Sequence, residues 1–367
     1  MKVHQPLIIH TEASLGWGGQ EIRILTECCW FRDKGFRCVL MAPPGSPIAE
    51  TFLKQGFEVI AVTFQKSSQI GDFFKCLQVF RDMSPYLVGS HSNIDTRVAL
   101  AAAACAGIRR RVRYRHVSIP VRPSPWNHFI YRIITTRIIT TAHAITAALS
   151  KDFSLPSGFA QSIPTGVANT DLSDKNVARS SVRESLGIPQ TARIITQVSV
   201  LRAWKGHQYL LAAFDQLATI HQDLHLVLVG GGPGLEYLPA QIAGLSSRDR
   251  VHLVGHQEDT YPFFKAADIA VLASTGGEGV PQSTLQCFSC ATAFVGTDVG
   301  GIPDIVTSGE NGLLVPPADS QQLAKALSTL LQDPILSATL AANARTTFDQ
   351  IGSVDYMGQS IRAFLDL

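Results

Sequence analysis

The chain has 367 residues, of which 46% are hydrophobic and 16% are charged, so it is long enough for two domains with separate cores. Its longest run of small apolar residues falls far below the ~20 residues that span a bilayer, and the N-terminal apolar run is too short for a signal peptide. We therefore expect a cytoplasmic protein that could meet the cytoplasmic membrane only peripherally, at its inner face.

The net charge of +2 conceals an asymmetry between the two halves of the chain. Residues 1–170 carry 19 Lys and Arg against 10 Asp and Glu, a balance of +9, whereas the remaining residues carry 12 against 19, a balance of −7. Nine arginines and no acidic residue fall within residues 96–151. This distribution predicts two halves with different partners.

Seven cysteines are scattered along the chain, and two of them, Cys287 and Cys290, form a CxxC motif. No second pair of ligands follows this motif. Because free cysteine packs as a small apolar residue, we interpret the pair as buried side chains within a helix rather than as a metal or redox site.

The elements of the first half alternate between strand and helix. An apolar run at residues 6–10 predicts a strand, a turn-rich stretch follows, and a helix is expected over residues 20–34, with Gly35 as its stop. Further helices are expected from Ser46 and after Thr96, and the other strand-like runs are CVLMAP, FEVIAV, LVGSHS and RVRYRHVS. Repeated strand, turn and helix indicate a parallel sheet with helices on both faces.

A short polar junction with Pro and Gly begins at Ser162, and the alternation then starts again. Its strand-like runs are RIITQVSV, LHLVLVG, VHLVG, DIAVLAS, TAFVGT and GLLV. The predicted fold class is therefore α/β, with Rossmann-like, doubly wound domains over residues 1–170 and 171–350 and a last helix over 351–367 that returns to the first domain. Such sheets bind ligands at the carboxyl ends of their strands, so two facing domains would hold the site in the cleft between them.

Turns that follow predicted strands hold the first candidate residues. Gly18 and Gly19 would let the backbone approach a ligand ahead of a helix N-terminus, although a plain tight turn has the same pattern. Arg202 and Lys205 suit a diphosphate, because arginine binds phosphate as a fork and lysine as a point charge. The alternative for the second turn is a solvated loop.

A third turn, GGGPG, follows the strand LHLVLVG and includes Gly230 and Gly232. Neither this turn nor the first one has the GxGxxG spacing of a dinucleotide-binding fingerprint, which argues against an NAD-dependent enzyme. A glycine turn that lets a nucleotide lie close to the backbone remains consistent with the pattern.

The stretch STGGEGVPQSTLQC places one carboxylate, Glu278, in a glycine-rich loop before a helix. Pro281 suits the first turn of that helix, whose N-terminus would attract a phosphate. A carboxylate beside a phosphate requires a group between them, and a sugar hydroxyl would donate strongly to the carboxylate. Gln286 lies a little over two helical turns further on and would reach a second polar group. The alternative is that Glu278 only complements the helix dipole.

The order of these motifs resembles that of the retaining glycosyltransferases of family 4, the glycosyl transferases group 1, which have the GT-B fold. The resemblance runs through nearly the whole chain, and the residues that carry it are Gly18-Gly19-x-Glu21, Ile163-Pro164-Thr165-Gly166-Val167, Arg202…Lys205-Gly206, Gly230 to Pro233, Glu278-Gly279, Thr297 to Asp304 and Glu310 to Pro316. The sequence departs from the family pattern at Gln286, where a second Glu is usual, and at Thr165, Ala168 and Asp304. An amide at position 286 can still hydrogen-bond to a ribose diol, but without charge.

The resemblance implies transfer of a sugar from a nucleotide-diphosphate sugar, by preference a UDP-sugar, to a glycan or glycolipid acceptor of the cell-surface polysaccharide or lipopolysaccharide type. It implies retention of configuration without a metal or other cofactor. The donor would bind the C-terminal domain and the acceptor the N-terminal one. The residues that it places near the donor are Gly18, Gly19, Gly230, Gly232, Gly279, Val280 and Gln286.

The resemblance also implies catalytic roles. Arg202 and Lys205 would stabilise the leaving diphosphate, and Glu278 would hold hydroxyls of the donor sugar. His116, at the carboxyl end of the strand RVRYR, would orient the transferred sugar by hydrogen bonding, and His91 is a weaker candidate. Two other classes remain open, namely a sugar-nucleotide epimerase of the same fold and a non-catalytic protein that binds a sugar nucleotide or a membrane.

Arginines interleaved with aromatic residues indicate a second partner. They are Arg109, Arg110, Arg111, Arg113, Arg115, Arg122, Arg132 and Arg137, with Trp126, Phe129 and Tyr131 among them. We favour an anionic membrane surface or a phosphorylated glycolipid acceptor over nucleic acid, because the rest of the chain is acidic and no nucleic-acid-binding motif occurs. The alternative is an exposed helix and loop with ordinary arginines.

Overall fold

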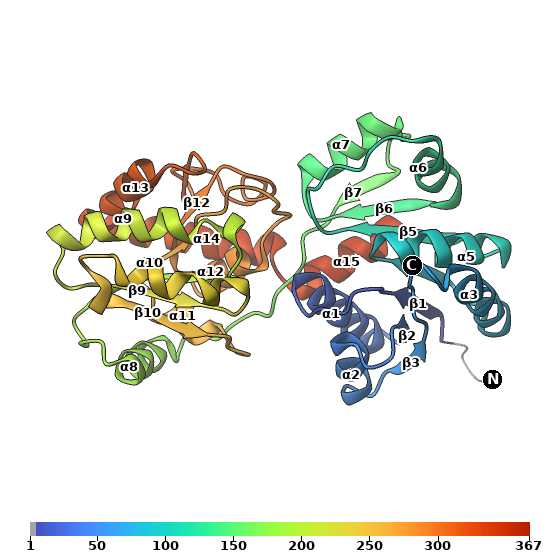
Figure 1. The fold of residues 1–367 in the computed structure, drawn as a ribbon, viewed down its shortest axis with the longest axis horizontal. Coiled ribbons are helices and arrows are strands. Elements are labelled where there is room, and N and C mark those ends of the chain that lie inside the picture. Colours follow the sequence, from blue (N-terminus) through green and yellow to red (C-terminus); the bar gives the residue numbers. More distant parts are fainter. Residues whose placement is uncertain (1–4) are drawn as a thin grey trace. The chain divides into compact units, whose positions relative to one another are not determined.

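The computed structural model describes residues 5–367, which divide into two compact units (Figure 1). Unit 1 comprises the chain up to Gly166 together with Val354–Leu367, and unit 2 comprises Val167–Ser353. These junctions lie four residues before and three residues after the boundaries expected at 170 and 350. Within the described part of the chain, no helix is both long and apolar enough to cross a membrane.

The sheet of unit 1 has seven parallel strands in the order β3-β2-β1-β4-β5-β6-β7. The strands are β1 (Leu7–Thr11), β2 (Arg37–Ala42), β3 (Glu58–Ala61), β4 (Leu87–Ser90), β5 (Arg110–Arg115), β6 (Arg137–Thr140) and β7 (Ala160–Ser162). The helices are α1 (Gly19–Asp33), α2 (Pro47–Lys54), α3 (Gln69–Met83), α4 (Asn93–Asp95), α5 (Ala101–Cys105), α6 (Pro125–Phe129), α7 (His143–Phe153) and α15 (Val354–Leu365). Two π-helical turns, η1 (Thr96–Leu100) and η2 (Ile130–Ile134), complete the unit.

Unit 1 has a core on each face of its sheet. Side chains alternate between the faces along each strand, so the neighbours Ile8 and Ile9 of β1 belong to different cores. One core is covered by α3, η1, α5, η2 and α7, and the other by α1, α2 and α15. Strands covered on both faces are almost continuously apolar, which explains why runs such as CVLMAP show no alternation of polar and apolar residues.

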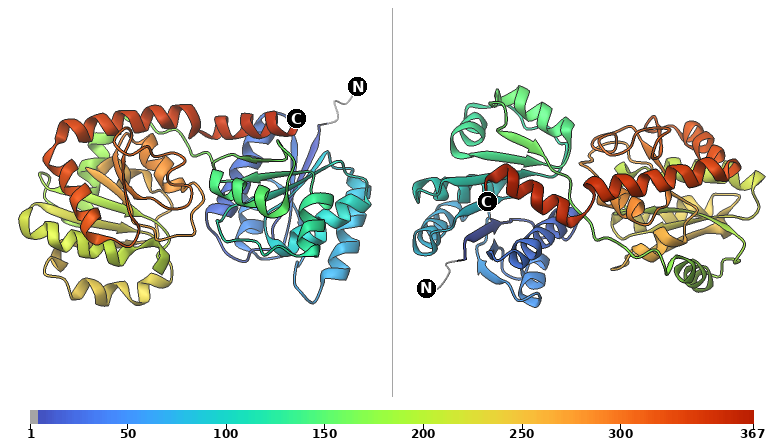
Figure 2. Two further views of the ribbon diagram at one scale, coloured as in Figure 1. Left: turned by 90° about the horizontal axis from the view of Figure 1, so that it is seen from above. Right: turned by 180° about the vertical axis from the view of Figure 1, so that it is seen from behind.

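The last helix, α15, packs against α1 within unit 1 (Figures 1 and 2). Gly358 allows this close contact, since a Cβ added there would lie 2.1 Å from the ring of Trp30. The Trp30 Nε1 also donates to Asp355 Oδ1 at 2.8 Å. A glycine on α15 and a tryptophan on α1 therefore fix how the end of the chain closes unit 1.

The sheet of unit 2 has six parallel strands in the order β10-β9-β8-β11-β12-β13. The strands are β8 (Arg193–Val198), β9 (Leu224–Val229), β10 (Val251–Gly255), β11 (Ile269–Leu272), β12 (Ala293–Thr297) and β13 (Leu313–Val315). The α-helices are α8 (Lys175–Leu186), α9 (His207–Ile220), α10 (Leu238–Ala243), α11 (Tyr261–Ala266), α12 (Gln282–Ser289), α13 (Ser320–Gln332) and α14 (Pro334–Ile351). The 3-10 turns are η3 (Ala203–Lys205), η4 (Pro233–Glu236) and η5 (Arg248–Arg250).

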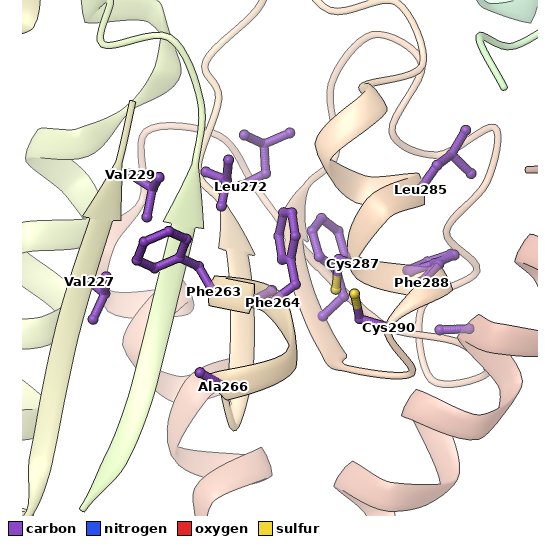
Figure 3. Close-up of a cluster of buried hydrophobic side chains, with 14 of the residues drawn as sticks. Val227, Val229, Phe263, Phe264, Ala266, Leu272, Leu285, Cys287, Phe288 and Cys290 are labelled. Atoms are coloured by element: carbon purple, nitrogen blue, oxygen red, sulfur yellow. The ribbon is translucent and has the colours of Figure 1, made fainter. Parts of the chain in front are cut away.

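Unit 2 also has a core on each face of its sheet. Figure 3 shows part of one core, to which Phe263 and Phe264 of α11 contribute together with Leu285, Cys287 and Phe288 of α12. Cys287 and Cys290 lie within this cluster, and both are free and buried. The interpretation of the CxxC motif as buried small side chains is confirmed, with Cys290 as the C-cap of α12 rather than inside it.

The strand order of both sheets confirms the predicted fold class of two Rossmann-like, doubly wound α/β domains. In unit 1 the strands β1 to β3 are added toward one edge of the sheet and β4 to β7 toward the other, so the strand order reverses between β1 and β4. In unit 2 the strand order reverses in the same way between β8 and β11. Ligands of doubly wound folds bind at the carboxyl ends of the strands at such switch points. Two details differ from expectation, because β6 and β7 were not predicted and the helix after Thr96 begins as the π-helical turn η1.

Candidate functional site

In unit 2, the loops that follow β8 and β11 bring together Lys205 and Glu278. Lys205 Nζ lies 2.5 Å from Glu278 Oε1, and Ser274 Oγ donates to the same oxygen at 2.5 Å. The lysine and the glutamate are only 9% and 5% exposed. Two donors at Oε1 fix the orientation of the carboxylate.

The buried side chain of Gln197 in β8 joins these two loops. Its Nε2 donates to Lys205 O at 3.1 Å, and its Oε1 accepts from Ala273 N at 3.2 Å. Gly206 brings the segments closer still, because its φ is +69° and a Cβ there would lie 1.8 Å from Ala273 O. Sequence reasoning missed Gln197, since a single polar residue inside an apolar strand formed no motif.

Glycines also set the backbone around Glu278. Gly300 has a φ of +58°, and a Cβ there would lie 2.3 Å from Glu278 O. Gly277 has a φ of +76°, and its Cβ position lies 3.5 Å from the ring of Trp204. Thr275 N donates to Trp204 O at 2.8 Å. The glycines of the TGGEG and TDVGG motifs thus let three chain segments meet where the carboxylate is presented.

The helix that follows this loop is α12. Gly279, Val280 and Pro281 are buried between Glu278 and the helix. Pro281 is the N-cap, so it precedes the first turn instead of occupying it as expected. The N-cap forms no side-chain capping bond with the residues that the structure describes, so the positive end of the helix dipole begins four residues after Glu278.

The side chains of two other predicted residues of unit 2, Arg202 and Gln286, form no hydrogen bond or ion pair with the side chains of this pair in the described part of the chain. Gln286 is half-buried on α12, where Thr260 Oγ1 lies 3.5 Å from its Oε1. Arg202 is exposed at the start of η3, and its side chain forms no hydrogen bond or ion pair with any residue that the structure describes. The structure therefore brings Lys205 and Glu278 into contact, but not Arg202 or Gln286.

The glycine-rich turn after β9 packs on the loop after β8. Gly230 and Gly232 have φ values of +145° and +137°. A Cβ at Gly230 would lie 1.9 Å from Ser199 O, and one at Gly232 would lie 3.0 Å from Leu201 O. This close approach of two turns explains why glycine stands at both positions, whether or not a ligand also contacts them.

In unit 1, three histidines form a hydrogen-bonded series at the carboxyl ends of neighbouring strands. His10 Nδ1 lies 2.9 Å from His91 Nε2, and His91 Nδ1 lies 2.9 Å from His116 Nε2. Tyr114 stacks on His91 with ring centroids 4.4 Å apart and donates to Glu27 Oε1 at 2.5 Å. The two histidines that the sequence singled out are therefore neighbours, and His116 directly follows β5 as expected.

Burial keeps this series uncharged. It lowers the pKa of His10 to about 3 and holds the pKa values of His91 and His116 well below the ordinary value. Three neutral rings in series each carry one N–H, so their hydrogens must point in one common direction. Burial raises the pKa of Glu27, which lies 3.6 Å from His10 Nε2, to about 7.

The charge of Glu27 biases that direction. An ionised Glu27 favours an N–H at His10 Nε2, and the series then leaves a lone pair at Nδ1 of His116. A protonated Glu27 removes this preference and permits the opposite order, with an N–H at the same atom. His116 can thus offer either a donor or an acceptor without becoming charged.

The first glycine-rich turn leads into α1. Gly18 is the N-cap in an extended conformation, and Gly19 is the first helical residue. Glu12, which sequence reasoning missed, follows β1 and accepts short hydrogen bonds from Gln20 Nε2 and Ser92 Oγ. These bonds tie the loop after β1 to the loop after β4 at the switch point of unit 1, and burial raises the pKa of Glu12.

The arginine-rich segment divides into engaged and exposed side chains. Arg110 donates to two carbonyls at the end of the chain, both at 3.1 Å, and Arg111 donates to two carbonyls of unit 1 at 2.5 Å each. Arg113 and Arg115 are buried. The exposed arginines of this segment are Arg109, Arg122 and Arg132. Arg110 and Arg111 therefore serve the packing of unit 1 rather than a surface patch.

Comparison with solved structures identifies the fold. The crystal structure of HepE from Anabaena in complex with UDP has a TM-score of 0.83 to this chain at 23% identity, over 99% of both chains. The protein has the GT-B fold.

Comparison with sequences identifies the family of the second unit. Residues 178–347 match the family described as glycosyl transferases group 1. The N-acetyl-alpha-D-glucosaminyl L-malate synthase of Bacillus anthracis is 27% identical over 51% of this chain and 49% of its own length. The D-inositol 3-phosphate glycosyltransferase of Corynebacterium jeikeium is 34% identical over 47% and 42%. The chain spans about half the length of the curated relatives it matches. Unit 2 is thus a glycosyl transferases group 1 domain, and it contains the Lys205–Glu278 pair.

Proposed function

We propose that the protein is a glycosyltransferase that moves a sugar from a nucleotide-diphosphate sugar to a glycan or lipid-linked acceptor, with retention of configuration. The observation that carries this proposal is the buried Lys205–Glu278 pair at the switch point of the group 1 domain. A cation and a carboxylate held side by side suit the two parts of such a donor, the diphosphate and the sugar hydroxyls. A structure of HepE in complex with UDP-glucose supports a UDP-sugar as the donor.

The transfer step breaks the bond between the anomeric carbon and the diphosphate oxygen and forms a bond from the same carbon to an acceptor hydroxyl on the same face. Lys205, Arg202 and the N-terminus of α12 stabilise the negative charge that develops on the leaving diphosphate. Glu278 accepts hydrogen bonds from hydroxyls of the donor sugar. The acceptor proton passes to a phosphate oxygen of the leaving group, so neither a separate protein base nor a metal is needed.

The remaining predicted residues complete the proposed site. Neutral His116 orients the transferred sugar by hydrogen bonding, which agrees with the low pKa that burial gives it. Gln286 contacts the ribose of the donor without a charge. The residues that line the donor are Gly18, Gly19, Gly230, Gly232, Gly279 and Val280.

We place this activity at the inner face of the cytoplasmic membrane, on an acceptor of the cell-surface polysaccharide or lipopolysaccharide type. Unit 2 binds the donor, and unit 1 binds the acceptor. The exposed residues Arg109, Arg122 and Arg132 are the ones available for contact with an anionic membrane surface.

The test is a panel of UDP-, GDP- and ADP-sugars, each incubated with and without lipid and glycan acceptors. Acceptor-dependent release of nucleoside diphosphate, with the donor's anomeric configuration kept in the product, supports the proposal. Interconversion of the sugar without an acceptor would indicate an epimerase, and binding without any turnover would indicate a non-catalytic protein. Glu278→Ala should abolish transfer, and Glu184→Ala, at an exposed acid on α8, should leave it unchanged.

A further inference from the structure

A pocket of about 260 Å³ lies in unit 1, beside the carboxyl end of β5. Four arginines line it, namely Arg97, Arg113, Arg115 and Arg122, together with two asparagines and an apolar wall that includes Tyr131. No acidic residue that the structure describes lines the pocket. Its volume is close to the lower end of the ~300–1,000 Å³ range of small-molecule sites.

Two of these arginines, Arg113 and Arg115, are buried. Arg113 and Arg115 are only 1% and 7% exposed, and neither forms an ion pair with a described residue. Arg113 donates to Ser90 O at 3.3 Å and to Asn93 Oδ1 at 3.1 Å, and Arg115 donates to Ile119 O at 2.6 Å. The Nε atom of each arginine is buried and has no hydrogen-bond partner among the described residues.

Such an arrangement is unfavourable unless an anion completes it. Burying a guanidinium removes it from water, and arginine is almost never buried without a paired charge. Neutral carbonyl and amide oxygens satisfy some of the N–H groups here but supply no negative charge. The pocket therefore combines a surplus of positive charge with unused donors.

Two buried acids of unit 1, Asp95 and Glu12, already have hydrogen-bond partners of their own. Asp95 on α4 uses its Oδ2 to accept from Thr11 Oγ1 and His91 N, both at 2.9 Å. The pKa of Asp95 is about 7, because burial raises it more than the charge of Arg113 lowers it, so Asp95 balances the charge of Arg113 only in part near neutral pH. Glu12 is engaged by the loop contacts described above.

The backbone around the pocket is also unusual. Both π-helical turns of unit 1 contribute to its lining, η1 through Thr96 and Arg97, and η2 through Ile130 and Tyr131. π-helical turns are rare and are frequently found at functional sites. Two of them on one pocket indicate that its shape is maintained for a ligand.

We propose that this pocket binds a phosphate group and, resting on the proposed function, that the phosphate belongs to the acceptor. The planar forks of Arg113 and Arg115 match the oxygens of a phosphate, and the exposed Arg97 and Arg122 add charge at the rim. Arg115 directly precedes His116, so an acceptor sugar attached to this phosphate lies next to the residue that orients the transfer. The acceptor is thus a phosphorylated sugar or a lipid-linked sugar phosphate.

The test uses rim residues, because exposed side chains can be changed without disturbing the fold. Titration calorimetry at low ionic strength measures the binding of inorganic phosphate and glycerol 3-phosphate to the full chain without any nucleotide sugar. The pocket variant is Arg97→Gln with Arg122→Gln. The matched control is Lys75→Gln with Arg81→Gln, which removes the same charge from exposed residues of α3 outside the pocket lining.

We expect the wild type and the control to bind the phosphates equally, and the pocket variant to bind roughly tenfold or more weakly, as expected for loss of hydrogen bonds to charged groups. Phosphate should also raise the thermal unfolding temperature of the wild type and the control more than that of the pocket variant. Equal binding by both variants, or no phosphate binding by the wild type, would overturn the proposal. So would equally tight binding of glucuronate, which offers a carboxylate in place of phosphate.

A second experiment tests whether the phosphate belongs to a soluble molecule or to a lipid. Sedimentation with phosphatidylcholine vesicles that contain phosphatidylglycerol measures binding to a lipid phosphate. Loss of vesicle binding in the pocket variant alone, with competition by glycerol 3-phosphate, supports a lipid-linked acceptor. Phosphate binding in solution without any vesicle binding supports a soluble sugar phosphate. None of these measurements depends on turnover, so absence of transfer would refute the proposed function and leave this binding result standing.

Discussion

Replacing Gly206 with alanine tests whether the loop that carries Lys205 is fixed against the end of β11. Gly206 has a φ of +69°, and the added Cβ would lie 1.8 Å from Ala273 O. The left-handed conformation costs a non-glycine residue about 1–2 kcal/mol. Relieving so short a contact requires a backbone shift that costs about 1–3 kcal/mol more. The free energy of unfolding of unit 2 should therefore fall by about 2–5 kcal/mol.

The matched control is Gly187→Ala, which lies in the same unit. Gly187 has a φ of +65°, and no atom lies within 4 Å of its Cβ position. This variant should lose only the conformational part, about 1–2 kcal/mol. The difference between the two variants thus isolates the contact with Ala273.

Urea unfolding followed by the fluorine NMR signal of a fluorotryptophan at position 204 measures the change in unit 2, since the other three tryptophans belong to unit 1. A displaced loop should also separate Lys205 from Glu278 and lower transfer activity, because a misplacement of about 1 Å can cost about 100-fold in rate. Equal loss of stability in Gly206→Ala and Gly187→Ala would show that the loop yields freely and is not fixed by β11.

Three further outcomes follow from the buried polar groups. Lys205→Met should lower the free energy of unfolding of unit 2 by about 3–5 kcal/mol, because it leaves the buried carboxylate of Glu278 without its partner. The double variant Lys205→Met with Glu278→Leu should recover much of that loss. Equal stability of the single and double variants in urea would contradict this reasoning. Gln286→Glu should tighten donor binding in calorimetry if position 286 contacts a ribose diol, and unchanged affinity would place the amide outside the site. Because burial raises the pKa of Glu27 from 4.5 to about 7, its contribution to stability is full below pH 4.5 and is lost as pH rises through 7. Glu27→Gln should therefore match the wild type near pH 4.5 and exceed its unfolding free energy by on the order of 3 kcal/mol at pH 8, whereas a pH-independent difference would be evidence against the raised pKa.

The architecture was largely predictable because parallel strands covered on both faces produce continuous apolar runs. Runs such as LHLVLVG and DIAVLAS correspond to β9 and β11 without ambiguity. The strands β6 and β7 were missed because RIIT and AQS are short, and RIIT also follows an arginine-rich segment. The π-helical turn η1 was missed because its sequence, TRVAL, does not differ in composition from an ordinary helix.

The candidate site was predictable where charged residues lie in a turn directly after a strand. Lys205 and Glu278 each followed an apolar strand, and the strand order then brought them together. Residues that act from inside strands or helices left no such signal, and Gln197, His10 and Glu27 belong to this group. Their roles depend on which strands become neighbours, and that information appears only once the sheet is assembled.

The connection between the two units has a practical consequence. Val167 and Ser353, the first and last residues of unit 2, pair in a parallel β-bridge, and Val167 N donates to Gly352 O at 2.9 Å. The first and last residues of unit 2 are therefore neighbours, so unit 2 is connected to unit 1 in the way that an inserted domain is. A short peptide that joins Gly166 directly to Val354 could accordingly close unit 1 with α15 in place. The isolated group 1 domain could likewise be produced as one continuous piece, which would allow ligands of each unit to be assigned separately.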